Sequence, residues 1–324
     1  MCITNNMPVW LFRCNYVDSS RKMPQYEQVA TMYEHNYCPI TILKEEEWDK
    51  SCYYARLKGE KVSNVPSYID RFVKLADAVK NEDVLVVLEY KDDGKGKGNK
   101  PEKKIGIIRK GSIIKTTTKV KYEIFYLELD TDSVITIPNN KFTILNGLIP
   151  SNVTLGPIQS RANAINELYH FIKDKRPIKR ELQNLPNEKI EDLCCKWLQS
   201  KYAKEYRLET VYVANGKYNF PVLDILGKTE GNSVLAAQVS YTENIGTIVT
   251  KIKKLVEIEF DIHLMFTNVT QAVFTNSCKK KGEEGAKPGT DVKHVQLETV
   301  WDNLNNDNEE KSYIENLFRQ SYEY

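Results

Sequence analysis

Long hydrophobic runs are missing from this sequence. No apolar segment approaches the roughly 20 residues that a helix needs to cross a bilayer. The first residues, MCITNNMPVW, combine neither a basic region nor an apolar core. We therefore expect a cytoplasmic protein that has no membrane contact and no signal peptide.

Cysteine and histidine patterns typical of metal or disulfide sites are also missing. The seven cysteines are an odd number, and none of them forms a CxxC pair. This excludes a zinc spacing and argues against a disulfide framework. The adjacent Cys194 and Cys195 are expected to be buried free thiols. The four histidines show no metal spacing and are expected to be structural or surface residues.

Nucleotide-binding motifs are absent as well. The chain contains neither GxxxxGK[ST] nor GxGxxG, so we do not expect an NTPase or a dinucleotide enzyme. An ATPase acting with this protein would be a separate chain. The net charge is only +2, so contact with nucleic acid would depend on local basic patches rather than on a global field.

The length and composition fit a protein with more than one core. A chain of 324 residues, 41% apolar and 28% charged, is long enough for two globular domains. We predict a β-rich domain over residues 1–155, a helical basic linker over 156–186 and an α/β domain over 187–324. Within the first domain, residues 66–80 have the apolar spacing of an amphipathic helix.

Basic side chains gather in the predicted linker, after a helix over 160–175. They are Lys175, Arg176, Lys179 and Arg180. Such a cluster suits contact with the DNA backbone. A hydrated linker is the alternative.

The second domain is predicted to contain two strands, 221–226 and 233–241, that are joined by a glycine turn. Alternation along a strand places Gln238 and Ser240 on one face, where pairing brings them near Asp224. A carboxylate between Leu223 and Ile225 is costly to bury without a partner, which indicates metal or ligand chemistry. The alternatives are a capped or salt-bridged structural acid at Asp224 and a core amide at Gln238.

The other predicted elements of this domain alternate between helix and strand. Helices are expected over 187–198 and 245–257, a core strand over 260–269, a strand running into a turn over 292–301, and a closing helix after it. This order is typical of an α/β layered core.

This chain contains a pattern similar to one of a known protein family. The pattern has a glutamate on a helix, then an aspartate, a glycine turn, and Gln-x-Lys on the next strand. Here the positions are Glu191, Asp224, Gln238 and, in place of the lysine, Ser240. The chain thereby resembles Mrr-like restriction endonucleases of the PD-(D/E)xK superfamily. The resemblance implies a restriction-endonuclease-like α/β/α core, with Mg²⁺ or Mn²⁺ held by Asp224 and Glu191.

The resemblance also assigns catalytic roles. Asp224, Glu191 and Gln238 would act at the metal, and Ser240 is included at the position of the missing lysine. A lysine of the helix over 245–257 could replace the lost cation. Lys253 is the chosen candidate, with Lys251 and Lys254 as alternatives, and all three could instead form a solvated helix face.

The first domain resembles PUA/EVE-type β-barrels that read modified bases. The matching segments are VWLFR (9–13), RFVKLADAVKNEDVLVVL (71–88) and KIGIIRKG (104–111). In such modules a flipped base stacks in an aromatic pocket. Trp10, Trp48 and Arg13 are therefore candidate nucleic-acid contacts, although both tryptophans could be core residues.

The function implied by these resemblances is metal-dependent DNA cleavage in a prokaryotic restriction or anti-phage defence system. The expected ligand is double-stranded DNA, with or without base modification, and a homodimer and a separate ATPase are the protein partners considered. The alternative is a catalytically inactive DNA-binding or assembly module that keeps the nuclease fold.

Overall fold

The computed structural model describes residues 6–15, 32, 34–43, 51–63, 65–91, 103–119, 122–137, 145, 148–149, 155–159, 161–214, 223–242, 244–281 and 292–322. The chain divides into two compact units, Met1–Lys179 and Arg180–Tyr324. This boundary falls inside the segment predicted as a linker, whose helix belongs to the first unit. Over the described ranges, no helix has both the length and the hydrophobicity to cross a membrane.

Two sheets build the first unit. The larger has the order β7-β4-β3-β1-β8, in which only β1 and β3 pair in parallel. Its strands are β1 (Val9–Asn15), β3 (Val84–Lys91), β4 (Lys103–Ile108), β7 (Ile135–Ile137) and β8 (Leu155–Ile158). The smaller, antiparallel sheet has the order β2-β6-β5 and contains β2 (Tyr37–Leu43), β5 (Lys115–Lys119) and β6 (Tyr122–Glu128). These described strands do not close into the barrel expected for residues 1–155.

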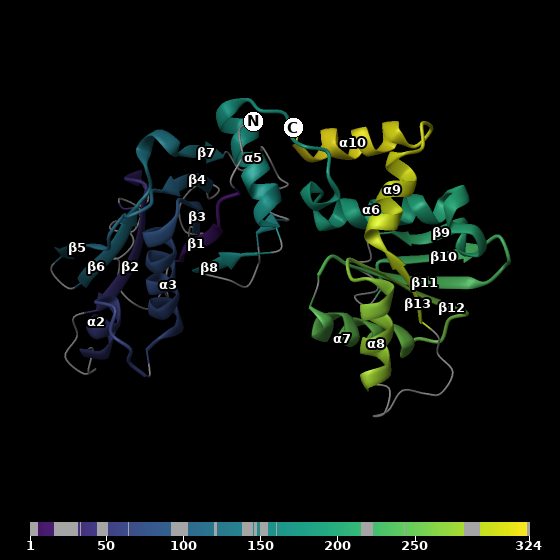
Figure 1. The fold of residues 1–324 in the computed structure, drawn as a ribbon, viewed down its shortest axis with the longest axis horizontal. Coiled ribbons are helices and arrows are strands. Elements are labelled where there is room, and N and C mark those ends of the chain that lie inside the picture. The colour runs from purple at the N-terminus through teal and green to yellow at the C-terminus, as the bar shows by residue number, and fades with distance from the viewer. Residues whose placement is uncertain are drawn as a thin grey trace. The chain divides into compact units, whose positions relative to one another are not determined.

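Helix α3 (Ser67–Asn81) supplies the centre of this unit's core, as the spacing over 66–80 predicts. Its buried side chains are Ile69, Phe72, Val73, Leu75, Ala76 and Val79. All of these except Val73 belong to one apolar cluster with residues of β1, β2, β3 and β6, so both sheets share this core. The unit also contains α2 (Ser51–Leu57) and α5 (Ala162–Asp174) (Figure 1).

The second unit is built on one five-stranded sheet with the order β13-β12-β11-β10-β9. Its strands are β9 (Leu208–Ala214), β10 (Ile225–Thr229), β11 (Val234–Ser240), β12 (Ile262–Thr267) and β13 (Val292–Gln296). The first three pair antiparallel, whereas β11, β12 and β13 are parallel. Parallel neighbours need crossover connections, which α7 (Ile245–Val256) and α8 (Gln271–Lys281) provide.

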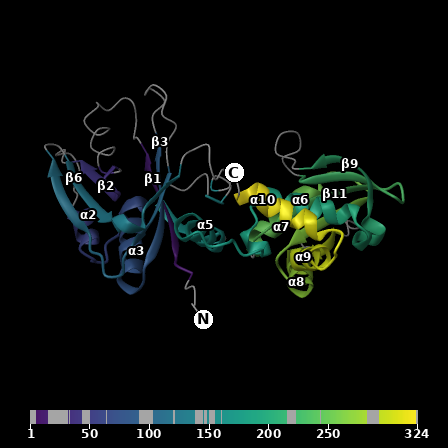
Figure 2. The same ribbon diagram turned by 90° about the horizontal axis from the view of Figure 1, so that it is seen from above.

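Helices cover both faces of this sheet (Figures 1 and 2). One side carries α6 (Asn187–Gln199), α9 (Leu297–Asn305) and α10 (Lys311–Tyr322), and the other carries α7 and α8. Alternation along β12 explains how both faces are buried. Phe266 meets Trp197 of α6 edge-on, with ring centroids 5.9 Å apart, whereas Met265 is buried with Ile248 of α7 and Phe274 of α8.

One element boundary differs clearly from that which the sequence predicts. The helix over 187–198 is present as α6, with Pro186 at its N-cap position. The strand over 292–301 ends at Gln296, and α9 follows it directly rather than a turn. The reason is a buried stripe at helical spacing, formed by Leu297, Val300, Trp301 and Leu304.

Candidate active site

Asp224 lies immediately before β10 and is fixed by the backbone of β11. Its amide N–H donates to the carbonyl oxygen of Ala237 at 3.0 Å. Its carboxylate Oδ2 accepts a hydrogen bond from the amide of Val239 at 2.7 Å. Asp224 therefore extends the hydrogen-bonding between β10 and β11 by one position, and its side-chain oxygen takes the place of a backbone acceptor.

The carboxyl group of Asp224 is held in an environment that disfavours its charge. Burial raises its pKa above the ordinary value, and the Val239 amide and the positive charge of Lys251 only partly offset this effect. Burial of a carboxylate without full compensation is typical of functional acids.

Lys251 of α7 reaches the same stretch of β11. Its Nζ donates to the carbonyl oxygen of Val239 at 2.7 Å. One residue therefore holds both groups, since Val239 donates to Asp224 through its N–H and accepts from Lys251 through its C=O. Within the described chain, Asp224 forms no ion pair at 4 Å or less, so the lysine charge acts on it from a greater distance.

The position of Lys251 on α7 explains why it reaches the sheet. It lies three residues after Ile248 and four before Leu255, both of which are buried. Lys253 and Lys254 are exposed in the last turn of the helix. The catalytic role predicted for Lys253 stays a prediction, but the geometry favours Lys251, and its place in the buried stripe is the sequence signal that singles it out.

Glu191 lies on α6, at the edge of that helix's buried stripe. The thiol of Cys194, one turn further on, is completely buried, and this burial raises its pKa well above the ordinary value. The carboxylates of Asp224 and Glu191 raise it further. Both acids therefore act on one thiol, although they lie on different elements. The sequence reading assigned Cys194 no role at the site, and its i+3 spacing from Glu191 was the available signal.

Gln238 and Ser240 are both 4% exposed on β11. They share a face with Ala236, which is buried against Leu255 of α7, so both side chains lie on the α7 face of the sheet. Their neighbours across the parallel pairing are Met265 and Thr267 of β12. The predicted polar patch of Asp224, Gln238 and Ser240 thus lies beside β12 in the sheet, and α7 covers it.

Within the described residues, no group of three or more histidine, cysteine, aspartate or glutamate side chains has the geometry of a metal site. A metal bound by the described residues alone would use two carboxylates at most, with other oxygen ligands. The metal-ligand roles of Asp224 and Glu191 therefore stay predictions.

The nucleic-acid contacts predicted in the first unit lie in different settings. Trp10 is 6% exposed within the core cluster around α3, where no base can stack on its ring. Arg13 is buried and hydrogen-bonded to Glu89, which Lys103 also approaches at 3.5 Å. Trp48 lies outside the described residues.

The basic segment after α5 is partly occupied by internal ion pairs. Arg176 contacts Glu167 at 3.4 Å, and Arg180 contacts a glutamate of α10 at 2.7 Å. Lys175 and Lys179 are exposed, and the backbone amide of Lys179 donates to Glu167 at 3.2 Å. Arg180 is exposed as well, so three of the four basic side chains of this segment reach the surface.

Comparison with known proteins identifies no family for this chain. No protein-family profile matches the sequence. No characterised protein matches it either. A solved structure with some likeness is that of a repair endonuclease from Pyrococcus abyssi, with a TM-score of 0.22 and 11% identity over 79% of this chain and 98% of that chain. A TM-score this low does not establish a shared fold.

Proposed function

We propose that the second unit hydrolyses phosphodiester bonds in DNA with a divalent metal ion, and that Lys251 supplies the cation missing at position 240. The observation that supports this most directly is the pairing at Val239. Its N–H holds Asp224 and its C=O holds the Nζ of Lys251, each at 2.7 Å. A buried acid and an amine are thereby fixed along one strand end.

The available donors suit a magnesium ion. Mg²⁺ keeps several waters and typically binds through one or two carboxylates together with substrate phosphate. Asp224 and Glu191 are the two carboxylates that the sequence pattern offers, and Gln238 offers an amide oxygen. When bound, such an ion lowers the pKa of a water and polarises the phosphate.

Lys251 has the chemistry that the missing lysine would supply. Ser240 carries no charge and is buried, so it cannot neutralise charge that develops on a phosphate. The ammonium of Lys251 is held near Asp224 by a backbone carbonyl. Preorganised positive charge of this kind stabilises the transition state of phosphoryl transfer.

The order of elements in the second unit supports the same proposal by analogy. A helix (α6), a strand (β9), a hairpin (β10–β11), a helix (α7) and a parallel strand (β12) follow one another. This is the order expected from the resemblance to Mrr-like restriction endonucleases. A fold does not determine an activity, so the proposal depends on the residues of the site. Reading of modified bases by the first unit stays a prediction.

The test is a cleavage assay with the full chain. Plain and cytosine-modified duplex DNA would be incubated with the parent protein in Mg²⁺ or Mn²⁺, and with Asp224→Asn, Lys251→Met and Lys253→Met variants. We expect cutting by the parent, none by Asp224→Asn, and a rate lower by about two orders of magnitude for Lys251→Met. Lys253→Met should cut like the parent.

Two results would contradict this proposal. No cutting by the parent on any of these DNAs would remove the nuclease assignment. Loss of cutting in Lys253→Met with normal cutting in Lys251→Met would return the catalytic role to Lys253.

A DNA-binding module without catalysis is the second candidate. The observation in its favour is that one carboxylate oxygen of Asp224 already accepts a backbone hydrogen bond, as a structural capping acid does. In that case the parent and Asp224→Asn would retard DNA equally in a native gel, and neither would cut it.

A further inference from the structure

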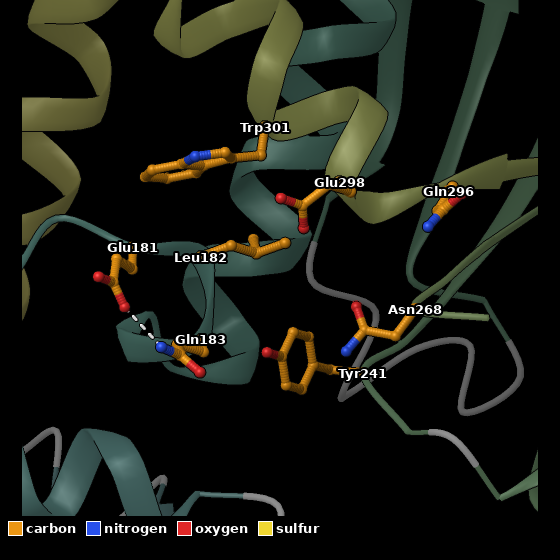
Figure 3. A pocket seen from close by; sticks show the side chains of 8 residues that line it. All are labelled: Glu181, Leu182, Gln183, Tyr241, Asn268, Gln296, Glu298 and Trp301. Atoms are coloured by element: carbon orange, nitrogen blue, oxygen red, sulfur yellow. Dashed lines mark hydrogen bonds between the residues drawn. The ribbon is translucent and has the colours of Figure 1, made fainter. Parts of the chain in front are cut away.

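A polar cavity of about 430 Å³ lies within the second unit (Figure 3). Its lining comes from the segment before α6, from the ends of three strands and from α9. The residues are Glu181, Leu182, Gln183, Tyr241, Asn268, Gln296, Glu298 and Trp301. A cavity of this size is in the range of small-molecule sites.

The cavity lies at the sheet edge where ligands of α/β proteins usually bind. Tyr241 follows β11, Asn268 follows β12 and Gln296 ends β13, and these three strands are parallel. Their carboxyl ends therefore meet at one edge. Val239, which holds Asp224 and Lys251, lies on β11 two residues before Tyr241 in the sequence.

Several polar groups of the cavity are available to a ligand. Gln296 occupies the N-cap position of α9, yet its side chain makes no capping hydrogen bond. The carboxylate of Glu298 and the amide of Asn268 point into the same space (Figure 3). Within the described chain, neither of these two side chains has an ion pair or hydrogen bond. Glu181 differs, because it accepts from Gln183 at 2.5 Å.

The lining chemistry selects the class of ligand. It contains carboxylates, amides, a phenol and an indole, but no lysine or arginine. A phosphate would therefore be repelled. A neutral group with N–H donors suits the carboxylate, and the amides can donate and accept at once. Tyr241 is partly exposed and offers a ring surface, whereas Leu182 and Trp301 are only 6% and 7% exposed and add little to it.

We propose that this cavity binds one unpaired nucleobase that carries an exocyclic amino group, with guanine as the best match. The adjacent N1–H and N2–H donors of guanine fit the two oxygens of the Glu298 carboxylate, and the amides of Asn268 and Gln296 reach its other edge atoms. Enzymes that accept extruded bases read them by such edge contacts and by stacking. This inference rests on the proposed function, because that function makes DNA the source of the base.

The test measures binding rather than cutting. The full chain would be titrated, without divalent metal, into fluorescein-labelled thymidine oligomers that carry one central guanosine, adenosine or cytidine, or none. Thymine lacks an exocyclic amino group, so the all-thymidine oligomer is the reference. We expect about tenfold tighter binding of the guanosine oligomer, and Glu298→Gln should remove this preference.

Glu257→Gln is the matched control, because Glu257 is exposed at the end of α7 and does not line the cavity. It should keep the preference, and thermal melting would show that both variants fold. Equal affinity for all four oligomers, or a guanosine preference that survives Glu298→Gln, would overturn the inference.

The outcome is separate from that of the cleavage assay. A protein that cuts DNA without this preference loses only the base-binding inference. A protein with the preference that does not cut loses only the nuclease assignment.

Discussion

Asp224 is an acid that folding makes harder to ionise, which gives a prediction about stability. Its folded-state pKa lies above the ordinary 3.8 because of burial. The contribution of Asp224 to the stability of the parent is therefore fully present below pH 3.8 and is lost as the pH rises through the folded-state pKa. Asp224→Asn keeps an acceptor for the Val239 amide and has no charge to bury. We expect it to melt at a higher temperature than the parent at neutral pH and at the same temperature in acid.

Asp307 provides a control of opposite sign in the same unit. The ammonium of Lys201, the hydroxyl of Tyr202 and the amide of Glu309 hold the pKa of Asp307 well below its usual range. Its contribution to stability is present above the unfolded-state pKa and is lost as the pH falls through the folded-state pKa. Asp307→Asn should therefore melt below the parent at neutral pH. If Asp224→Asn also melts lower there, Asp224 is a structural cap rather than a strained functional acid.

At the residue scale, the sequence predicts the acids of the candidate site but not the groups that hold them in place. Asp224 was visible because a carboxylate between two apolar residues needs a reason to be there. The choice among Lys251, Lys253 and Lys254 required knowing which side of α7 faces the sheet. That side is set by packing against β11 and β12, which no local pattern encodes fully. The Val239 backbone, which holds both groups, has no sequence signature.

At the scale of single elements, Gly227 of β10 gives a sharp prediction about packing. A Cβ on Gly227 would lie 2.6 Å from the carbonyl oxygen of Thr210 and 2.8 Å from Cδ1 of Leu208, both on β9. The β9–β10 register shifts at the same place. Gly227→Ala should therefore destabilise the protein by about 1–3 kcal/mol, measured by denaturant unfolding.

Gly231, in the turn after β10, is the matched control for this substitution. The nearest atom to a Cβ there is Oγ1 of Thr229 at 3.7 Å. Gly231→Ala should change the free energy of unfolding by less than about 0.5 kcal/mol. Equal losses in both variants would mean that chain flexibility, rather than the close approach of β9, decides the result.

The predictability of elements follows their local periodicity. Helices α3 and α6 were found because each has an apolar stripe at helical spacing. The start of α9 was missed because Leu297 directly continues the apolar pattern of β13, without a glycine, proline or capping side chain between them. A change from strand spacing to helix spacing is ambiguous over so few residues when no glycine or proline separates the two elements.

For the molecule as a whole, the pairing of distant strands was the hardest feature to predict. The first unit's strands could be recognised one by one, but their division between two sheets depends on pairing between distant residues such as β1 with β3 and with β8. In the second unit, the predicted order agrees with the structure for α6, β10, β11, α7 and β12, but the crossover helix α8 between β12 and β13 was not predicted. The boundary between the units, at residue 179, falls inside the predicted linker, but the helix of that segment is part of the first unit.

The division at residue 179 predicts that the second unit folds alone. Its core contains residues from its own helices and strands, including Ile190, Leu193, Cys194, Trp197 and Leu198 of α6. A fragment of residues 180–324 should show one cooperative thermal transition and mixed helix and strand circular dichroism. A fragment of 207–324, which lacks α6, should remain unfolded because the sheet face around Phe266 loses its cover. If the 180–324 fragment is also unfolded, its stability depends on residues before 180, and the two units form one cooperative structure.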